Sequence, residues 1–202
     1  KLPKFKVLNP IKFYWLLFTS ITGIWELSFL INYNLTCNYA SNLIQNNQHV
    51  WTNKYSPLEL IPYRFSVLFY SEYGAYADRE YMLEKNNWSR VIEGSHLVFC
   101  GLGSFLALLL KKNKKDKLLL KEFQNYNLEK YYLIFISTSM SSQAMNSILY
   151  IINYFHETQD PTNPNYNSTD FPTGTLLIKR PFMYVNILWT IMPLYILYKL
   201  LI

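Results

Sequence analysis

Two glutamates of this chain, Glu26 and Glu93, each stand alone in a long apolar segment. Glu26 lies within residues 13–31 and Glu93 within residues 91–110, and neither segment contains another Asp, Glu, Lys or Arg. A charged side chain at the centre of a membrane helix costs about 2.5–3.5 kcal/mol on insertion scales, so such a residue usually faces a protein interior or a ligand. The two carboxyls are therefore candidates for a site within a membrane.

Polar side chains from three other places fall at about the same depth as Glu26. His96, Gln143 and Asn186 each lie about 20–22 Å from the lysine at the basic end of their own segment, at 1.5 Å per residue. Two carboxyls and an imidazole suit reversible proton transfer, which needs one group that donates a proton and one that accepts it. The indole of Trp189, just below Asn186, offers its face to a cation.

A plainer interpretation stays open for the amide and hydroxyl side chains of this layer. Polar residues often form hydrogen bonds between membrane helices, and Gln143, Asn146 and the serines of residues 137–142 are explained as well in this way as by a ligand. Asn186 alone, and Trp189 as a packing residue, have the same alternative. The two glutamates are harder to explain by helix contacts alone.

The elements that must position these groups are long apolar helices. Of 202 residues, 50% are hydrophobic and 16% are charged, whereas a soluble domain usually has about 25% charged residues. Helices of about 20 apolar residues can cross the roughly 30 Å hydrocarbon core of a membrane. Such segments occur at residues 13–31, 91–110, 131–154 and 182–202. We therefore expect an all-α integral membrane protein, a four-helix bundle that forms a single domain.

The net charge of +6 comes largely from lysines beside these segments, which does not indicate a nucleic-acid-binding surface. Lysines precede the first segment within residues 1–12, cluster at residues 111–117 after the second, and recur at Lys199. Because basic residues mark the cytosolic or matrix side of a membrane, we expect both termini on that side. Glycosylation sequons on the opposite side are then expected at Asn34, Asn87 and Asn167.

A long connection, residues 33–87, joins the first two segments on the far side of the membrane. It is too long for a bare loop, and its aromatic-rich part, residues 57–81, is expected to form short interfacial amphipathic helices or a lid over the bundle. The second far-side connection, residues 156–181, is expected to be irregular. Cys37 and Cys100 are expected in a loop and in a helix, without a disulfide between them, and no metal or cofactor motif is present.

Several sequence blocks carry a wider pattern. They are "ITGIWELSFLINY" with Glu26, "EYGAYADREY" from Glu72 to Tyr81, "IEGSHLVFCGLGS" with Glu93 and Gly101, "SSQAMNSILYIINYFHE" with Gln143 and Tyr150, and "FMYVNILWTIMP" with Asn186, Trp189 and Pro193. Together and in this order they resemble the emopamil-binding-protein superfamily (the EXPERA domain), which includes sterol Δ8-Δ7 isomerase and the sigma-2 receptor. The resemblance is greater to the isomerase branch.

The resemblance implies a sterol-sized cavity inside the bundle that opens to lipid. It implies protonation of a sterol 8,9 double bond, a carbocation and loss of a proton at C7, with no metal or organic cofactor. It also implies binding of lipophilic amines, whose ammonium group imitates the cation. The expected catalytic residues are Glu26, Glu93 and His96. The expected substrate contacts are Thr22, Gln143, Tyr150, Asn186 and Trp189.

One exchange separates this chain from the isomerases. They carry His four residues before the first-helix Glu and Thr three residues after the second Glu, whereas here these positions are Thr22 and His96. Either the imidazole reaches the same point from the opposite wall, or the site is no longer used. Two functions therefore stay open. One is a sterol isomerase of the endoplasmic reticulum, and the other is a non-catalytic lipid-binding protein or accessory subunit of a larger complex, such as one in the mitochondrial inner membrane. A homodimer is compatible with both.

Overall fold

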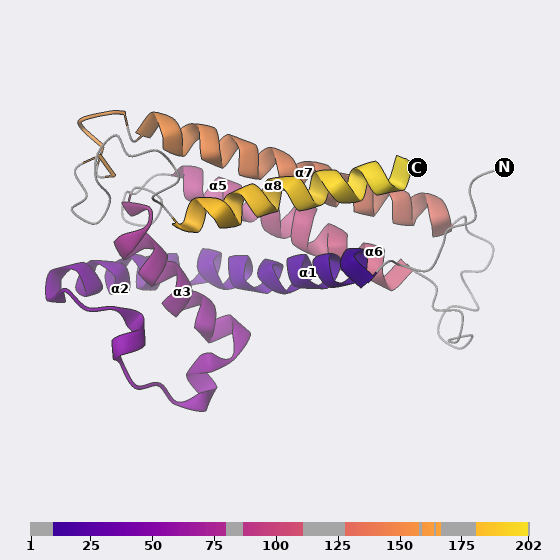
Figure 1. Cartoon of the computed structure of the whole chain (residues 1–202). Coiled ribbons are helices and arrows are strands. Elements are labelled where there is room, and N and C mark those ends of the chain that lie inside the picture. Colours follow the sequence, from indigo (N-terminus) through magenta and orange to yellow (C-terminus); the bar gives the residue numbers. More distant parts are fainter. Residues whose placement is uncertain are drawn as a thin grey trace.

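The structure, a computed structural model, is all-helical and shows no strand in the residues that it describes. These residues are 10–79, 87–110, 128–157, 159–163, 165–166 and 181–201. Figure 1 shows the helices. Their order is α1 (Pro10–Ile31), α2 (Tyr33–Asn46), η1 (Val50–Thr52), η2 (Pro57–Leu60), α3 (Pro62–Tyr76), α5 (Asn87–Ser95), η3 (His96–Leu102), α6 (Gly103–Leu110), α7 (Leu128–Glu157) and α8 (Pro181–Leu201).

Three stretches are long and apolar enough to cross a membrane. They are α1, the continuous stretch Asn87–Leu110 formed by α5, η3 and α6, and Met183–Leu201 within α8. These stretches match three of the four predicted segments. Three of the α-helices, α1, α3 (Pro62–Tyr76) and α8, begin at a proline, which suits the first helical position because its backbone has no N–H to leave unsatisfied.

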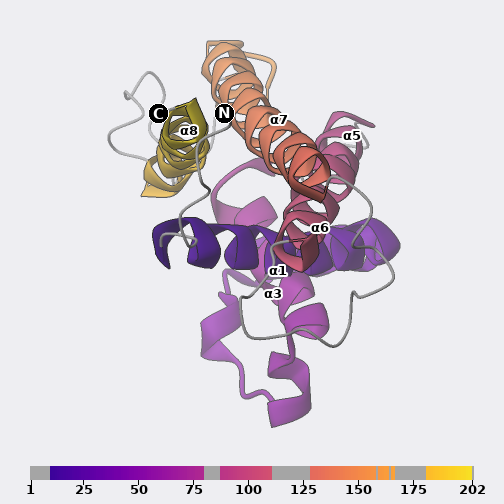
Figure 2. The same ribbon diagram turned by 90° about the vertical axis from the view of Figure 1, so that its right-hand side faces the viewer.

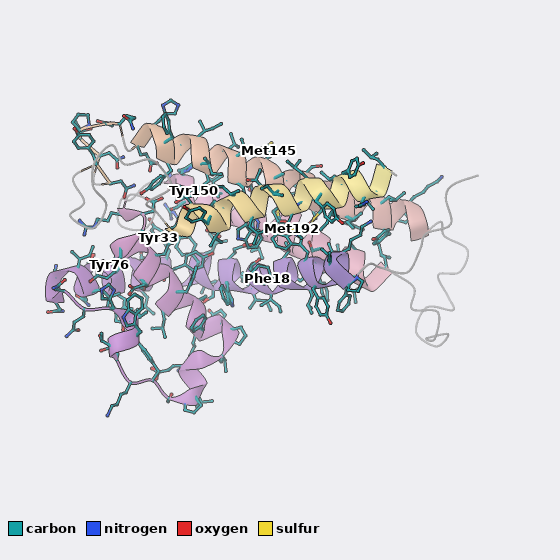
Figure 3. The ribbon with its side chains drawn as sticks, in the orientation of Figure 1. Phe18, Tyr33, Tyr76, Met145, Tyr150 and Met192 are labelled. Atoms are coloured by element: carbon teal, nitrogen blue, oxygen red, sulfur yellow. The ribbon has the colours of Figure 1, made fainter. Side chains whose placement is uncertain are left out.

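The fourth predicted segment, residues 131–154, lies within α7, which has 30 residues. This helix is long enough to span a membrane but is not among the three apolar stretches, because polar side chains interrupt its sequence. Several of them face inward: Ser139 and Gln143 are fully buried. The opposite face of α7 is apolar and exposed, as at Met145, which is labelled in Figure 3.

Two hydrophobic clusters fill the interior between the helices, one toward each end of α1. α1 packs between α3 on one flank and the η3–α6 stretch on the other, while α7 packs along α6 and α8 along α7; Figure 2 shows this arrangement after a quarter turn about the vertical axis. One cluster lies toward the start of α1 and includes Trp15, Leu16, Tyr132, Ile136, Met140 and Ile196. The other lies toward the end of α1 and includes Phe29, Tyr33, Tyr70, Tyr150, Tyr154 and Met183.

The connection that starts at residue 33 is partly helical, as predicted, and α3 packs against α1. A partly buried polar contact holds the segment before α3: Glu72 contacts His49 Nδ1 at 2.6 Å and accepts a hydrogen bond from the Val50 backbone N–H at 2.9 Å. The expectation that Cys37 lies in a loop is wrong. The residue lies in α2, because residues 33–46 continue as a helix almost directly from α1.

Some predicted features lie outside the described residues. They are the lysines within residues 1–9, the cluster at residues 111–117, the sequon at Asn167, and Glu80 and Tyr81 of the "EYGAYADREY" block. Within the second connection, the described residues 159–163 and 165–166 form turns, as expected for an irregular segment.

Candidate functional site

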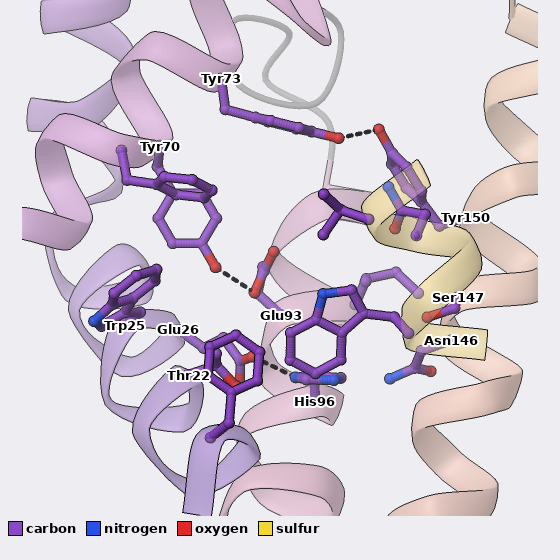
Figure 4. Close-up of a pocket in the computed structure, with 16 residues that line it drawn as sticks. Thr22, Trp25, Glu26, Tyr70, Tyr73, Glu93, His96, Asn146, Ser147 and Tyr150 are labelled. Atoms are coloured by element: carbon purple, nitrogen blue, oxygen red, sulfur yellow. Dashed lines mark hydrogen bonds and ion pairs between the residues drawn. The ribbon is translucent and has the colours of Figure 1, made fainter. Parts of the chain in front are cut away.

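A cavity of about 430 Å³ lies where α1, α3, α5, η3, α7 and α8 meet. Its volume falls in the range of about 300–1,000 Å³ that is usual for small-molecule sites. Figure 4 shows the cavity in close-up. Seven of the residues predicted from the sequence line it: Thr22, Glu26, Glu93, His96, Tyr150, Asn186 and Trp189.

The first polar pair of the cavity joins two helices. Glu26 of α1 is 3% exposed, and its Oε1 contacts Nδ1 of His96, which is the first residue of η3. Figure 4 shows the two side chains facing each other across the cavity wall. The ion pair thus connects α1 to the second predicted span, although 70 residues separate its members in the sequence.

A hydrogen-bond chain behind this pair fixes which imidazole nitrogen carries the proton. The Trp15 indole N–H donates to Gln143 Oε1 at 2.8 Å. The amide nitrogen of Gln143 must therefore point the other way, toward Thr19 Oγ1 at 3.3 Å and toward His96 Nε2 at 3.5 Å. An NH₂ group can only donate, so the Nε2 atom of His96 is the acceptor. In the neutral imidazole the remaining proton sits on Nδ1, between His96 and Glu26, and a second proton gives an imidazolium that forms an ion pair with the Glu26 carboxylate.

Two buried polar atoms of the cavity lining make no hydrogen bond within the described part of the chain. They are Oε2 of Glu26 and the indole Nε1 of Trp25. Buried polar groups almost always have a partner, and each exception calls for an explanation. Here one carboxylate oxygen and one N–H group, both from residues that line the cavity, remain without a hydrogen bond in the described part of the chain.

The second carboxyl of the cavity, Glu93, is held from the opposite side. Tyr70 of α3 donates its phenol hydrogen to Glu93 Oε2 at 2.9 Å, and the Tyr70 ring packs 4.7 Å from the Phe29 ring, centroid to centroid. Glu93 lies three residues before His96, at the junction of α5 and η3. The cavity therefore presents two carboxyls, each with a different hydrogen-bond partner.

Aromatic rings form the end of the cavity nearest the start of α1. Trp189 of α8 stacks on Phe18 at a centroid distance of 5.4 Å and an interplanar angle of 29°. It meets the His96 imidazole edge-on, at 5.4 Å and 75°. An indole in this position combines a large apolar surface with an electron-rich face beside the Glu26–His96 pair.

The backbone around His96 departs from regular α-helix. Residues 96–102 form a π-helix, a rare geometry with i→i+5 hydrogen bonds that is frequent at functional sites. Within it, Gly101 packs directly on Gly23 of α1. The sequence block containing His96 gave no signal for this wider turn.

The structure does not bring every predicted contact into the cavity. Gln143 is fully buried beside the lining residues and contacts Trp15, Thr19 and His96 instead of the open space. The Thr22 side chain lines the cavity, but its hydroxyl donates to the Thr19 carbonyl at 2.9 Å.

Sequence reasoning missed the residues that α3 contributes. Phe69, Tyr70 and Tyr73 line the cavity, as does Trp25 of α1. The available signal was the spacing of aromatic residues within 57–81, which suits one face of a helix but does not identify the surface that this face covers.

The described residues contain no group of three or more His, Cys, Asp or Glu side chains that would hold a metal ion. The donors in the cavity are instead arranged as hydrogen-bonded pairs between neighbouring helices. Comparison of the chain with protein-family models, curated proteins and solved structures finds no match.

Proposed function

We propose that this chain is an intramembrane sterol isomerase of the Δ8-Δ7 type, related to the emopamil-binding-protein superfamily. The observation that carries the proposal is the Glu26–His96 pair in an apolar cavity, with Glu26 Oε2 left without a hydrogen bond in the described part of the chain. Such a pair holds a transferable proton beside a space of ligand size.

The membrane setting is part of the proposal. Three helical stretches are long and apolar enough to span, and α7 lies beside two of them with several of its polar residues, such as Ser139 and Gln143, turned inward. We place all four in the membrane of the endoplasmic reticulum, with the termini on the cytosolic side. The mitochondrial inner membrane, with the termini in the matrix, is the alternative.

The proposed reaction needs no co-reactant. In its imidazolium form the Glu26–His96 pair gives a proton to one carbon of a sterol double bond, which leaves a carbocation on the other. Glu93 then removes a proton from the carbon adjacent to the cation, and the double bond re-forms one position along. Glu93 then releases that proton to water and the pair takes up a proton from water, which completes the cycle. The Trp189 ring, edge-on to His96, stabilises the cation through its π face.

The decisive experiment is conversion of a Δ8 sterol by the purified chain in deuterium oxide. We expect one deuterium atom in each molecule of Δ7 product. Because general acid–base catalysis contributes about 10²–10⁴-fold, Glu26→Gln and Glu93→Gln should each slow turnover by at least 100-fold. Glu59→Gln makes the same change at a residue that does not line the cavity and should leave turnover unaltered.

Unchanged turnover in Glu93→Gln would refute the proposed acid–base roles. Binding of the sterol without any conversion would favour the second function, a non-catalytic lipid-binding protein or accessory subunit of a larger complex. The Glu26–His96 pair is compatible with that function also, because it neutralises one buried carboxyl without a ligand.

A further inference from the structure

A second polar cluster lies at the opposite end of the cavity from the Trp189 ring. Tyr73 of α3 and Tyr150 of α7 both line the cavity, and their hydroxyls are hydrogen-bonded to each other. Figure 4 shows this pair well separated from His96. The Tyr150 hydroxyl also contacts Asp78 Oδ2 at 2.8 Å. Asp78 is 1% exposed and does not line the cavity.

Backbone geometry fixes the direction of the hydrogen bonds in this cluster. The backbone N–H of Arg79 donates to Asn165 Oδ1 at 2.8 Å, so the amide nitrogen of Asn165 must be the atom that faces Asp78 Oδ1, also at 2.8 Å. One carboxylate oxygen of Asp78 thus accepts from Asn165. The other oxygen accepts the hydrogen of Tyr150, since an ionised carboxylate has no hydrogen to give.

The same donor-to-acceptor direction continues to Tyr73, which lines the cavity. Because the Tyr150 hydrogen is used on Asp78, the hydrogen shared by the two phenols must come from Tyr73. The Tyr73 oxygen then offers its lone pairs, and not a hydrogen, to a molecule in the cavity. A buried carboxylate at the end of a hydrogen-bond chain polarises each member of it, which makes this oxygen a stronger acceptor than an isolated phenol.

We propose that this end of the cavity binds the hydroxyl group of a lipid, with the lipid O–H donating to the Tyr73 oxygen. The proposal rests on the proposed occupancy of the cavity by a sterol-like lipid and specifies which class it takes. An alcohol supplies the required hydrogen. A ketone, an ester or an ether offers only acceptor atoms, so it would leave the Tyr73 oxygen facing another acceptor.

The spacing along the helices limits where the reacting carbons lie. Tyr150 is seven residues beyond Gln143, or about 10 Å along α7, and Gln143 is level with His96. Glu93 is three residues from His96, about 4–5 Å along its own helix. A ligand whose hydroxyl contacts Tyr73 therefore places carbons about 5–10 Å away between Glu93 and the Glu26–His96 pair.

The test compares three probes that differ only at one substituent: a Δ8 sterol with a 3β-hydroxyl, its 3-ketone and its 3-methyl ether. Binding is measured on the full chain in lipid nanodiscs. We expect the alcohol to bind about five- to tenfold more tightly than the other two, the usual worth of one hydrogen bond. Tyr73→Phe should bring the alcohol down to the affinity of the ketone and leave the ketone affinity unchanged.

A second variant tests the direction of the hydrogen bonds from Tyr73 through Tyr150 to Asp78. Tyr150→Phe disconnects Tyr73 from Asp78, so the Tyr73 hydrogen becomes available to a ketone, and the ketone should gain affinity relative to the alcohol. A purely structural role would not produce this reversal. Tyr132→Phe makes the same change at a buried tyrosine of α7 that does not line the cavity, and it should preserve the preference of the unmodified chain.

Equal binding of alcohol and ketone by the unmodified chain would overturn the inference, as would an equal loss for all three probes in Tyr73→Phe. If Tyr73→Phe does not elute as a monodisperse protein, the Tyr150→Phe comparison decides the question. Binding and turnover separate the two proposals. Preference for the alcohol without conversion refutes only the isomerase, and conversion with equal binding refutes only the hydroxyl site.

Discussion

Gly23 of α1 and Gly101 of η3 face each other so closely that a Cβ atom on Gly101 would lie 2.8 Å from the Gly23 Cα atom. Real Cβ contacts are essentially never this short. Gly23 is three residues before Glu26, and Gly101 is five residues after His96, which is about one turn of a π-helix. The two glycines therefore set the separation at which Glu26 and His96 can meet.

Gly101→Ala should push α1 away from η3, because the atom it meets is backbone and cannot rotate aside. We expect a loss of about 1–3 kcal/mol, typical of overpacked cores, and a fall in the thermal unfolding midpoint of about 2–4 °C per kcal/mol. The measurement is thermal unfolding in detergent followed by circular dichroism. Gly94→Ala is the matched control, since its nearest neighbour would be a leucine methyl at 3.9 Å. Equal midpoints for the two variants would contradict the close-packing argument.

The exchange of residue types at positions 22 and 96 can be reversed. His96→Thr removes the partner of Glu26 and should lower Δ8-sterol turnover by about 10²–10⁴-fold. Adding Thr22→His supplies an imidazole from the other side of the same cavity, because Thr22 also lines it. We expect the double variant to regain at least tenfold over His96→Thr. A double variant no faster than the single one would show that the two positions are not equivalent.

Gln143 is expected to act by positioning its neighbours and not by touching a ligand. Gln143→Met leaves the buried Trp15 N–H without its hydrogen-bond acceptor, which should cost about 1–3 kcal/mol of stability. In a Trp15→Phe background the same change should cost at least about 1 kcal/mol less, because no N–H remains to be stranded. The measurement is a double-mutant cycle on thermal unfolding, with sterol affinity recorded in parallel. A large loss of sterol affinity without loss of stability would instead assign Gln143 to the binding surface.

Cys37 provides a pH-dependent test of the packing of helix α2. Burial raises the pKa of its thiol, although Tyr33 and Arg90 act in the opposite direction. Because the thiolate is the reactive form, a raised pKa means less thiolate at neutral pH. Alkylation of Cys37 by a maleimide should therefore be slow at pH 7 and should still be rising at a pH where an exposed cysteine has levelled off.

The matched control for this profile is the same chain in denaturant, where Cys37 is exposed. Its alkylation rate should level off at lower pH than that of the folded chain, as measured by mass spectrometry of the Cys37 peptide. A folded-state profile that levels off first would contradict the burial of this thiol.

The sequence was sufficient to locate the long helices and the polar layer. Isolated carboxyls in apolar segments are rare, so Glu26 and Glu93 could be singled out from the sequence alone. The constant rise of a helix placed His96 at the level of Glu26. These inferences need only composition and helix geometry. Both depend on residues within one helix, where sequence distance and spatial distance are related directly.

Contacts between segments that lie far apart in the sequence could not be predicted from composition and helix geometry. The aromatic spacing within α3 indicated a helix with one apolar face, but the choice between a membrane surface and α1 depends on the complete packing. The Tyr73–Tyr150–Asp78 cluster joins three parts of the chain, so no single sequence window contains it. The assignment of Gln143 also changed in detail, because its depth was predictable but the side on which its amide lies was not.

The wide turn at residues 96–102 accommodates one residue more than a regular helix would hold there. A π-helical turn contains one residue more than an α-helical turn, so deleting a single residue from η3 would let this stretch close into a regular α-helix. The segments on either side would keep their faces, because the wide turn absorbs its extra residue locally. One codon lost here would therefore change the turn that carries His96 while Glu93 still faced the interior, and the two walls of the cavity would no longer match.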